Sequence, residues 1–96
     1  MYIVEFHNLK PNDEVDEALT EHRAFLARYV ELGIIVAAGP KVPRTGGMIV
    51  VADVPRAQLD QMLAEDPFLQ RGSARCVVTE FRSNFLSPAL LQGASG

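Results

Sequence analysis

The stretch VDEALTEHRAFLARYVELGIIVAAGP, residues 15–40, decides the fold, because it joins a helical pattern directly to a strand pattern. Its apolar side has the i, i+3, i+4, i+7 spacing of an amphipathic helix, with Val15, Ala18, Leu19, His22, Phe25, Leu26, Tyr29 and Val30 on one face. Gly33 is placed to end this helix, since glycine readily takes the left-handed conformation found at helix C-termini. Residues 34–40 then form a strand that is apolar on both faces and closes with Gly39 and Pro40.

The segments on either side add three strands and one helix. Residues 1–9 alternate in polarity, with Tyr2, Val4 and Phe6 on one side, which predicts a first strand. Residues 48–53 predict a third strand, and Gly46-Gly47 is interpreted as the hairpin turn that precedes it. A second helix carries Leu59, Met62 and Leu63 on one face, and a fourth strand carries Val77, Thr79 and Phe81.

The predicted order is β-α-β-β-α-β, which is typical of the ferredoxin-like α+β unit, a four-stranded antiparallel sheet with two helices on one face. We expect one such domain over residues 1–86 and a partly flexible tail over residues 87–96. Two helices leave the second sheet face uncovered, although two strands are apolar on both faces. A second copy of the chain packed sheet against sheet would cover it, so a homodimer is expected.

Composition narrows the possible functions. The chain has 96 residues, a formal net charge of −3 and 48% hydrophobic residues, which fits one folded domain and argues against nucleic acid as a partner. No stretch is long and apolar enough to predict a membrane span, and the start of the chain lacks the features of a signal peptide. Cys76 is the only cysteine, so an internal disulfide is impossible and a cytoplasmic location is expected.

His22 and Asp66 are the main candidates for chemistry. His22 stands on the apolar side of the first helix, where it is either a core histidine bonded to a backbone carbonyl or a general acid/base. Asp66 follows the second helix and precedes Pro67, so it is either the N-cap of the next turn or a carboxylate directed at a site. Both roles are compatible, because a carboxylate has two oxygens. A carboxylate beside the histidine would orient its ring.

These residues resemble the YciI-like family of small dimeric α/β-barrel proteins. The resemblance rests on EHRAFLARYVELGIIVAAGP (residues 21–40), on Gly46-Gly47 before an apolar strand, and on LAEDPFLQRG (residues 63–72). It implies a catalytic dyad of His22 and Asp66, with Gly39 and Pro40 close to the substrate pocket. It also implies a homodimer without metal or organic cofactor, and an activity in the breakdown of ring compounds, including elimination from chlorinated aromatics.

The other polar candidates have simpler interpretations. His7 on the first strand is interpreted as a solvated or interface histidine, and Cys76 as a small core or edge residue. Arg44 and Arg71 could each bind a substrate carboxylate or phenolate, although arginines in such loops are usually solvated. Two histidines without a cysteine cluster do not predict a metal site.

Three functions follow from these patterns. The first is a cofactor-independent lyase, dehydrochlorinase or isomerase in which His22 moves a proton on a small cyclic metabolite and Asp66 orients it. The alternative is a small-molecule-binding or regulatory module without turnover, which would tolerate His22→Gln. A third is a structural or assembly subunit that functions only by binding other subunits through its apolar sheet face. The same fold supports each of them.

Overall fold

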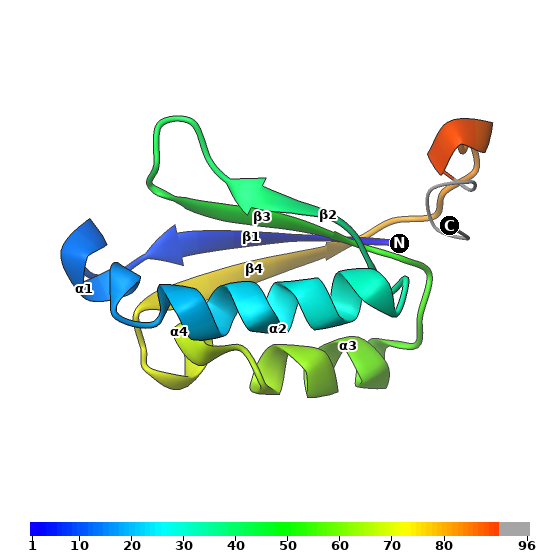
Figure 1. The fold of residues 1–96 in the computed structure, drawn as a ribbon. Coiled ribbons are helices and arrows are strands. Elements are labelled where there is room, and N and C mark those ends of the chain that lie inside the picture. Colours follow the sequence, from blue (N-terminus) through cyan, green and yellow to red (C-terminus); the bar gives the residue numbers. More distant parts are fainter. Residues whose placement is uncertain (91–96) are drawn as a thin grey trace.

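The computed structural model describes residues 1–90, so residues 91–96 of the predicted tail lie outside the described residues. Eight elements follow one another between residues 2 and 80: β1 (Tyr2–Asn8), α1 (Asn12–Asp16), α2 (Leu19–Glu31), β2 (Ile35–Pro40), β3 (Gly46–Val51), α3 (Arg56–Ala64), α4 (Pro67–Gln70) and β4 (Ala74–Glu80). The strands pair in the order β2-β3-β1-β4, and every pair is antiparallel. Helices α2 and α3 lie side by side on one face of this sheet (Figure 1). The predicted ferredoxin-like α+β fold is confirmed.

The core lies between the sheet and its helices. Tyr2, Val4 and Phe6 alternate inward along β1 and are buried, as their spacing predicts. Val4 is opposite Ile49 of β3, and the helices contribute buried apolar residues to the same layer, including Phe25, Leu59 and Met62. Burial of each large apolar side chain stabilises the fold by about 1.5–3 kcal/mol, so the apolar face of each helix holds it on the sheet.

The first predicted helix is divided into two. Helix α1 ends at Asp16 and α2 begins at Leu19, while Ala18 takes a non-helical conformation with φ −104° and ψ 6°. The backbone N–H of Ala18 donates to the carbonyl of Val15 in a tight turn. Both Val15 and Ala18 are buried there, so the turn brings the apolar side of α1 onto the core. Gly33, with φ 76°, ends α2 as predicted.

The prediction that Gly46 and Gly47 form the hairpin turn is wrong. Both belong to β3, where they pair with His7 and Phe6 of β1, and residues 41–45 make the connection from β2. A Cβ atom at position 46 would lie 1.8 Å from the carbonyl oxygen of Phe6. Glycine is therefore needed at this position because the backbones of β1 and β3 approach closely, not because of a turn.

The second face of the sheet carries both apolar and charged side chains. β1 presents Ile3, Glu5 and His7 to it, and these residues are partly buried. Val50 lies opposite Ile3 on β3, and Val77, which is 44% exposed, lies opposite Glu5 on β4. No described helix covers this face, and none of the helices within residues 1–90 is long and apolar enough to cross a membrane.

Candidate active site

Asp66 occupies the junction between α3 and α4. α3 ends at Ala64, and Pro67 is the first residue of α4, which keeps Asp66 in an extended conformation with φ −71° and ψ 119°. The Asp66 side chain accepts a hydrogen bond from the backbone N–H of Phe68 at 3.0 Å. Asp66 is therefore the N-cap of α4, which is one of its two predicted roles.

The His22 side chain, on helix α2, contacts the Asp66 carboxylate. Its Nδ1 atom lies 2.9 Å from Oδ1 of Asp66. The imidazole is 12% exposed and the carboxylate is completely buried. Because an ionised carboxylate only accepts hydrogen bonds, this contact places a proton on Nδ1. In neutral imidazole, Nε2 is then the basic nitrogen, and it has no hydrogen-bond partner among residues 1–90.

Both hydrogen bonds of the Asp66 side chain use the same oxygen. From the sequence, each of the two carboxylate oxygens is expected to make one of them. Oδ1 accepts both from Phe68 and from His22, whereas Oδ2 is buried without a protein partner among the described residues. A cap and an imidazole partner are thus combined at a single atom. The consequence is that the start of α4 and the ring of His22 are positioned by the same side chain.

Aromatic rings surround the His22 imidazole. The ring of Phe68 stacks on it, with centroids 3.8 Å apart and planes at 12°. The ring of Phe25 is inclined by 30° to the imidazole with centroids 6.1 Å apart, and Phe6 makes an edge-to-face contact with centroids 6.5 Å apart. Phe68 therefore contacts both members of the pair, since its N–H binds Asp66 and its ring packs on His22. This packing restricts the rotation of the imidazole.

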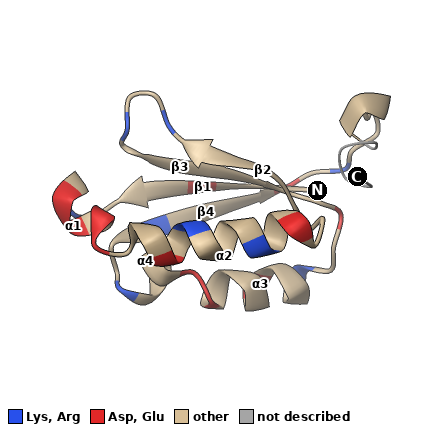
Figure 2. Ribbon diagram, viewed as in Figure 1, with Lys and Arg blue, Asp and Glu red and all other residues tan. Residues whose placement is uncertain are grey.

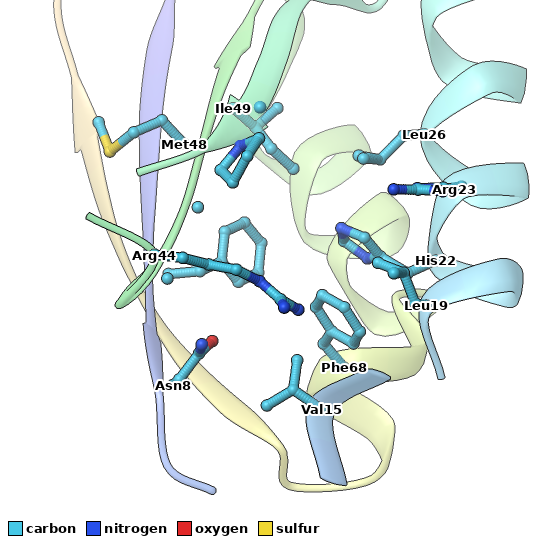
Figure 3. Close-up of a pocket in the computed structure, with 15 residues that line it drawn as sticks. Asn8, Val15, Leu19, His22, Arg23, Leu26, Arg44, Met48, Ile49 and Phe68 are labelled. Atoms are coloured by element: carbon cyan, nitrogen blue, oxygen red, sulfur yellow. The ribbon is translucent and has the colours of Figure 1, made fainter. Parts of the chain in front are cut away.

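A cavity of about 320 Å³ opens beside His22. Its lining is mainly apolar, and His22 projects from α2 toward it opposite strand β3 (Figure 3). Gly39 and Pro40, the predicted substrate-binding residues, both line this cavity. Its size is at the lower end of the range for small-molecule sites, and a dry apolar wall with a few polar groups is typical of them.

Arg44 and Arg71, the two loop arginines considered as substrate-binding residues, differ in their position relative to the cavity. Arg44 lines the cavity and forms an ion pair with Asp16 at the end of α1. The hydrogen bond from Arg44 holds the pKa of the Asp16 carboxyl below its usual value. Arg71 lies outside the cavity lining and pairs with Glu21 at 3.3 Å.

His7 and Cys76 lie apart from the pair. His7 is on the open face of the sheet, where its Nε2 is 3.5 Å from Glu5 and Lys41 contacts its other ring nitrogen. Cys76 is half-buried against the core on β4, opposite Phe6. Burial, followed by the negative charge of Asp66, raises the pKa of the Cys76 thiol. A raised pKa disfavours the thiolate that a nucleophile requires.

Within residues 1–90 no three His, Cys, Asp or Glu side chains are grouped so that they could hold a metal ion. Sequence patterns did not single out Phe68, Arg23 or Asn8, which also line the cavity. Phe68 stands two residues after Asp66, so the capping motif itself contains a signal for it. Arg23 and Asn8 carry no such signal, because their place at the cavity depends on how α2 and β1 meet.

Comparisons with known proteins agree with this architecture. The fold resembles that of 5-chloro-2-hydroxyhydroquinone dehydrochlorinase from Burkholderia phenoliruptrix, solved in complex with 2,5-dihydroxybenzoquinone, with a TM-score of 0.62 and 17% identity. The match covers 85% of this chain and 94% of the other. No curated protein matches the sequence. The family model described as YCII-related domain matches residues 1–82, and the chain therefore belongs to this family.

Proposed function

We propose that the protein is a small cofactor-independent enzyme that performs general acid/base chemistry on a cyclic, aromatic-derived metabolite. The observation that carries this proposal is the 2.9 Å contact between His22 Nδ1 and Asp66 Oδ1 beside an apolar cavity. A base whose other nitrogen is held by a buried carboxylate is the minimum arrangement for moving a proton on a bound organic molecule. The fold itself is compatible with other functions.

The two residues have distinct roles in this proposal. Asp66 accepts a hydrogen bond from the protonated Nδ1 of His22 and keeps the ring oriented, while Nε2 removes a proton from a carbon or a phenolic oxygen of the substrate. The electron pair of that bond forms a new double bond, and a leaving group such as chloride departs with its own bonding pair. In an isomerisation, the imidazolium returns the proton at another carbon instead. General acid/base catalysis of this kind contributes about 10²–10⁴-fold.

The substrate class is supported by two observations. A protein of similar fold is named as a dehydrochlorinase and was solved with a dihydroxybenzoquinone. In this chain, the cavity next to His22 is mainly apolar and its lining includes Phe6 and Phe68, which suits a flat ring. Gly39 and Pro40 would contact that ring from the end of β2.

Turnover by the His22→Gln variant tests this proposal. The assay measures chloride release from 5-chloro-2-hydroxyhydroquinone and from a series of chlorinated hydroquinones. We expect wild-type protein to accelerate release from at least one of them, and His22→Gln to lower kcat by about 10²–10⁴-fold. His7→Gln is the matched control, because His7 lies on the open face of the sheet and should leave kcat unchanged.

The alternative is a binding module, and the same assay distinguishes it. Wild-type protein that binds these compounds without releasing chloride, and a His22→Gln variant that binds them equally well, would contradict the enzyme and support the module. A change of stability alone in His22→Ala would favour the assembly subunit.

We also propose a homodimer in a cytoplasmic setting. Strands β2 and β3 contain no charged residue, so these two strands add no charge to the open face of the sheet (Figure 2). Packing this face on that of a second copy would remove apolar surface from water and form a dimeric α/β barrel. Cys76 has no partner for an internal disulfide, which fits a reducing compartment.

A further inference from the structure

The side chains that line the cavity beside His22 include two cationic groups, although the chain as a whole is acidic. The chain has a formal net charge of −3. The residues that line the cavity nevertheless include Arg23 and Arg44 and, within the part of the chain that the structure describes, no aspartate or glutamate. Cationic groups at the wall of an apolar cavity attract anions more strongly than the same groups in bulk water, because the local dielectric constant is lower.

Arg44 is placed to contact a ligand in this cavity. It belongs to the 41–45 connection between β2 and β3, and its side chain reaches across from that connection toward Phe68 (Figure 3). Asp16 accepts hydrogen bonds from Nη1 and Nη2 of Arg44. A guanidinium group has five N–H donors, so three remain for a ligand while Asp16 keeps the side chain in place.

Arg23 adds a second positive charge next to the proposed base. It follows His22 directly on α2 and lines the same cavity. Within residues 1–90 it forms no ion pair. Unlike Arg44, Arg23 makes no hydrogen bond to Asp16, although its positive charge also contributes to lowering the pKa of the Asp16 carboxyl.

From this arrangement we infer that the cavity selects ring compounds that carry an anionic substituent, such as a carboxylate, with Arg44 and Arg23 binding that substituent. The inference rests on the proposed function, since it defines which substrates reach His22. Arg44 would contribute the larger share, because its planar group can bind a carboxylate through two parallel hydrogen bonds while Asp16 holds it. A neutral ring of the same shape would gain only the apolar contacts.

A binding experiment with two probes of similar shape tests this inference. The probes are 4-hydroxybenzoate, which is an anion at pH 7, and its neutral analogue 4-hydroxybenzamide. Dissociation constants are measured by calorimetry and by amide chemical-shift changes for wild type, Arg44→Gln, Arg23→Gln and Arg56→Gln. Arg56 is the matched control, because it also forms an exposed ion pair, with Asp60, but lies outside the cavity lining.

We expect wild type to bind the benzoate at least about tenfold more tightly than the benzamide. One charge-assisted hydrogen bond contributes about this much to binding affinity. Arg44→Gln should remove most of this preference, Arg23→Gln part of it, and Arg56→Gln none. Chemical-shift changes in the wild type should be concentrated on cavity-lining residues.

Three results would overturn the inference: equal affinity of wild type for both probes, an unchanged preference in Arg44→Gln, or no binding of the benzoate. Because binding is measured without turnover, these results are independent of kcat in His22→Gln. A preference for the anion together with absent turnover would instead reject the proposed enzyme and leave the anion site in place.

Discussion

At the scale of single residues, Asp66 links backbone structure to the candidate site. One oxygen caps α4 through Phe68 and also holds Nδ1 of His22, and both contacts are near 3 Å. Because the residue is completely buried, neither contact can be replaced by bulk water without local opening. The side chain is therefore expected to matter for stability as well as for chemistry.

Substitution of Asp66 should separate these contributions. Asp66→Ala removes both hydrogen bonds and should lower the free energy of unfolding by about 2–4 kcal/mol, the sum of a lost cap and an unsatisfied buried imidazole. Asp66→Asn keeps an acceptor oxygen and should cost less. Urea denaturation at one fixed protein concentration measures both values. An equal loss in the two variants would contradict the hydrogen bonds as the cause.

The thiol of Cys76 provides a test of burial at the fourth strand. Its raised pKa means that less thiolate is present at a given pH in the folded protein than in the unfolded chain. Alkylation by iodoacetamide at pH 8 should therefore be slower when folded, and should accelerate as the pH rises past the ordinary thiol value of about 8.5. The urea-unfolded chain is the control. Equal rates in the two states would be inconsistent with a buried Cys76.

At the scale of elements, the pairing of β1 with β3 depends on a close approach between their backbones. Gly46 in β3 faces the carbonyl of Phe6 in β1, whereas Gly39 in β2 has open space around its Cβ position. Both glycines belong to strands, yet only one of them is required by packing. The need for glycine at position 46 arises from the neighbouring strand and not from the local chain.

Alanine substitutions at the two glycines should therefore differ. Gly46→Ala should lower the free energy of unfolding by at least about 3 kcal/mol, because the new methyl group would force β1 and β3 apart. Gly39→Ala is the matched control and should change it by less than about 0.5 kcal/mol. Thermal denaturation of both variants checks this prediction, and similar melting temperatures would refute it.

At the scale of the whole molecule, the sheet is covered on one face only (Figure 1). Val77 on the open face is 44% exposed, and Val30 on α2 is exposed to a similar degree at 47%. The proposed dimer would bury the first residue and leave the second in water. The two valines thus allow the interface to be tested with a matched pair.

Val77→Lys should convert the proposed dimer into a monomer, because a charged side chain would be buried in the interface without a partner. Val30→Lys should leave the dimer intact. Sedimentation equilibrium at several protein concentrations measures the mass of each. A wild-type monomer, or a Val77→Lys variant that stays dimeric, would exclude sheet-against-sheet association.

The sequence by itself determined the order of the elements, their faces and the family. Alternation identified β1 and β4, helical spacing identified the buried sides of α2 and α3, and Pro67 marked the end of a helix. These features are local, because each depends on side-chain spacing within one element or on the restricted backbone of proline. Even the two candidate residues, His22 and Asp66, could be selected as ionisable groups at apolar positions.

Only the tertiary structure decided how these parts meet. The close approach at Gly46 and the contact between His22 and Asp66 both depend on segments that are distant in the sequence. The same holds for Arg44, since its place at the cavity requires the loop after β2 to face α1 and α2. A local pattern records which face a residue prefers, but distances between segments are set by packing, which depends on the whole core.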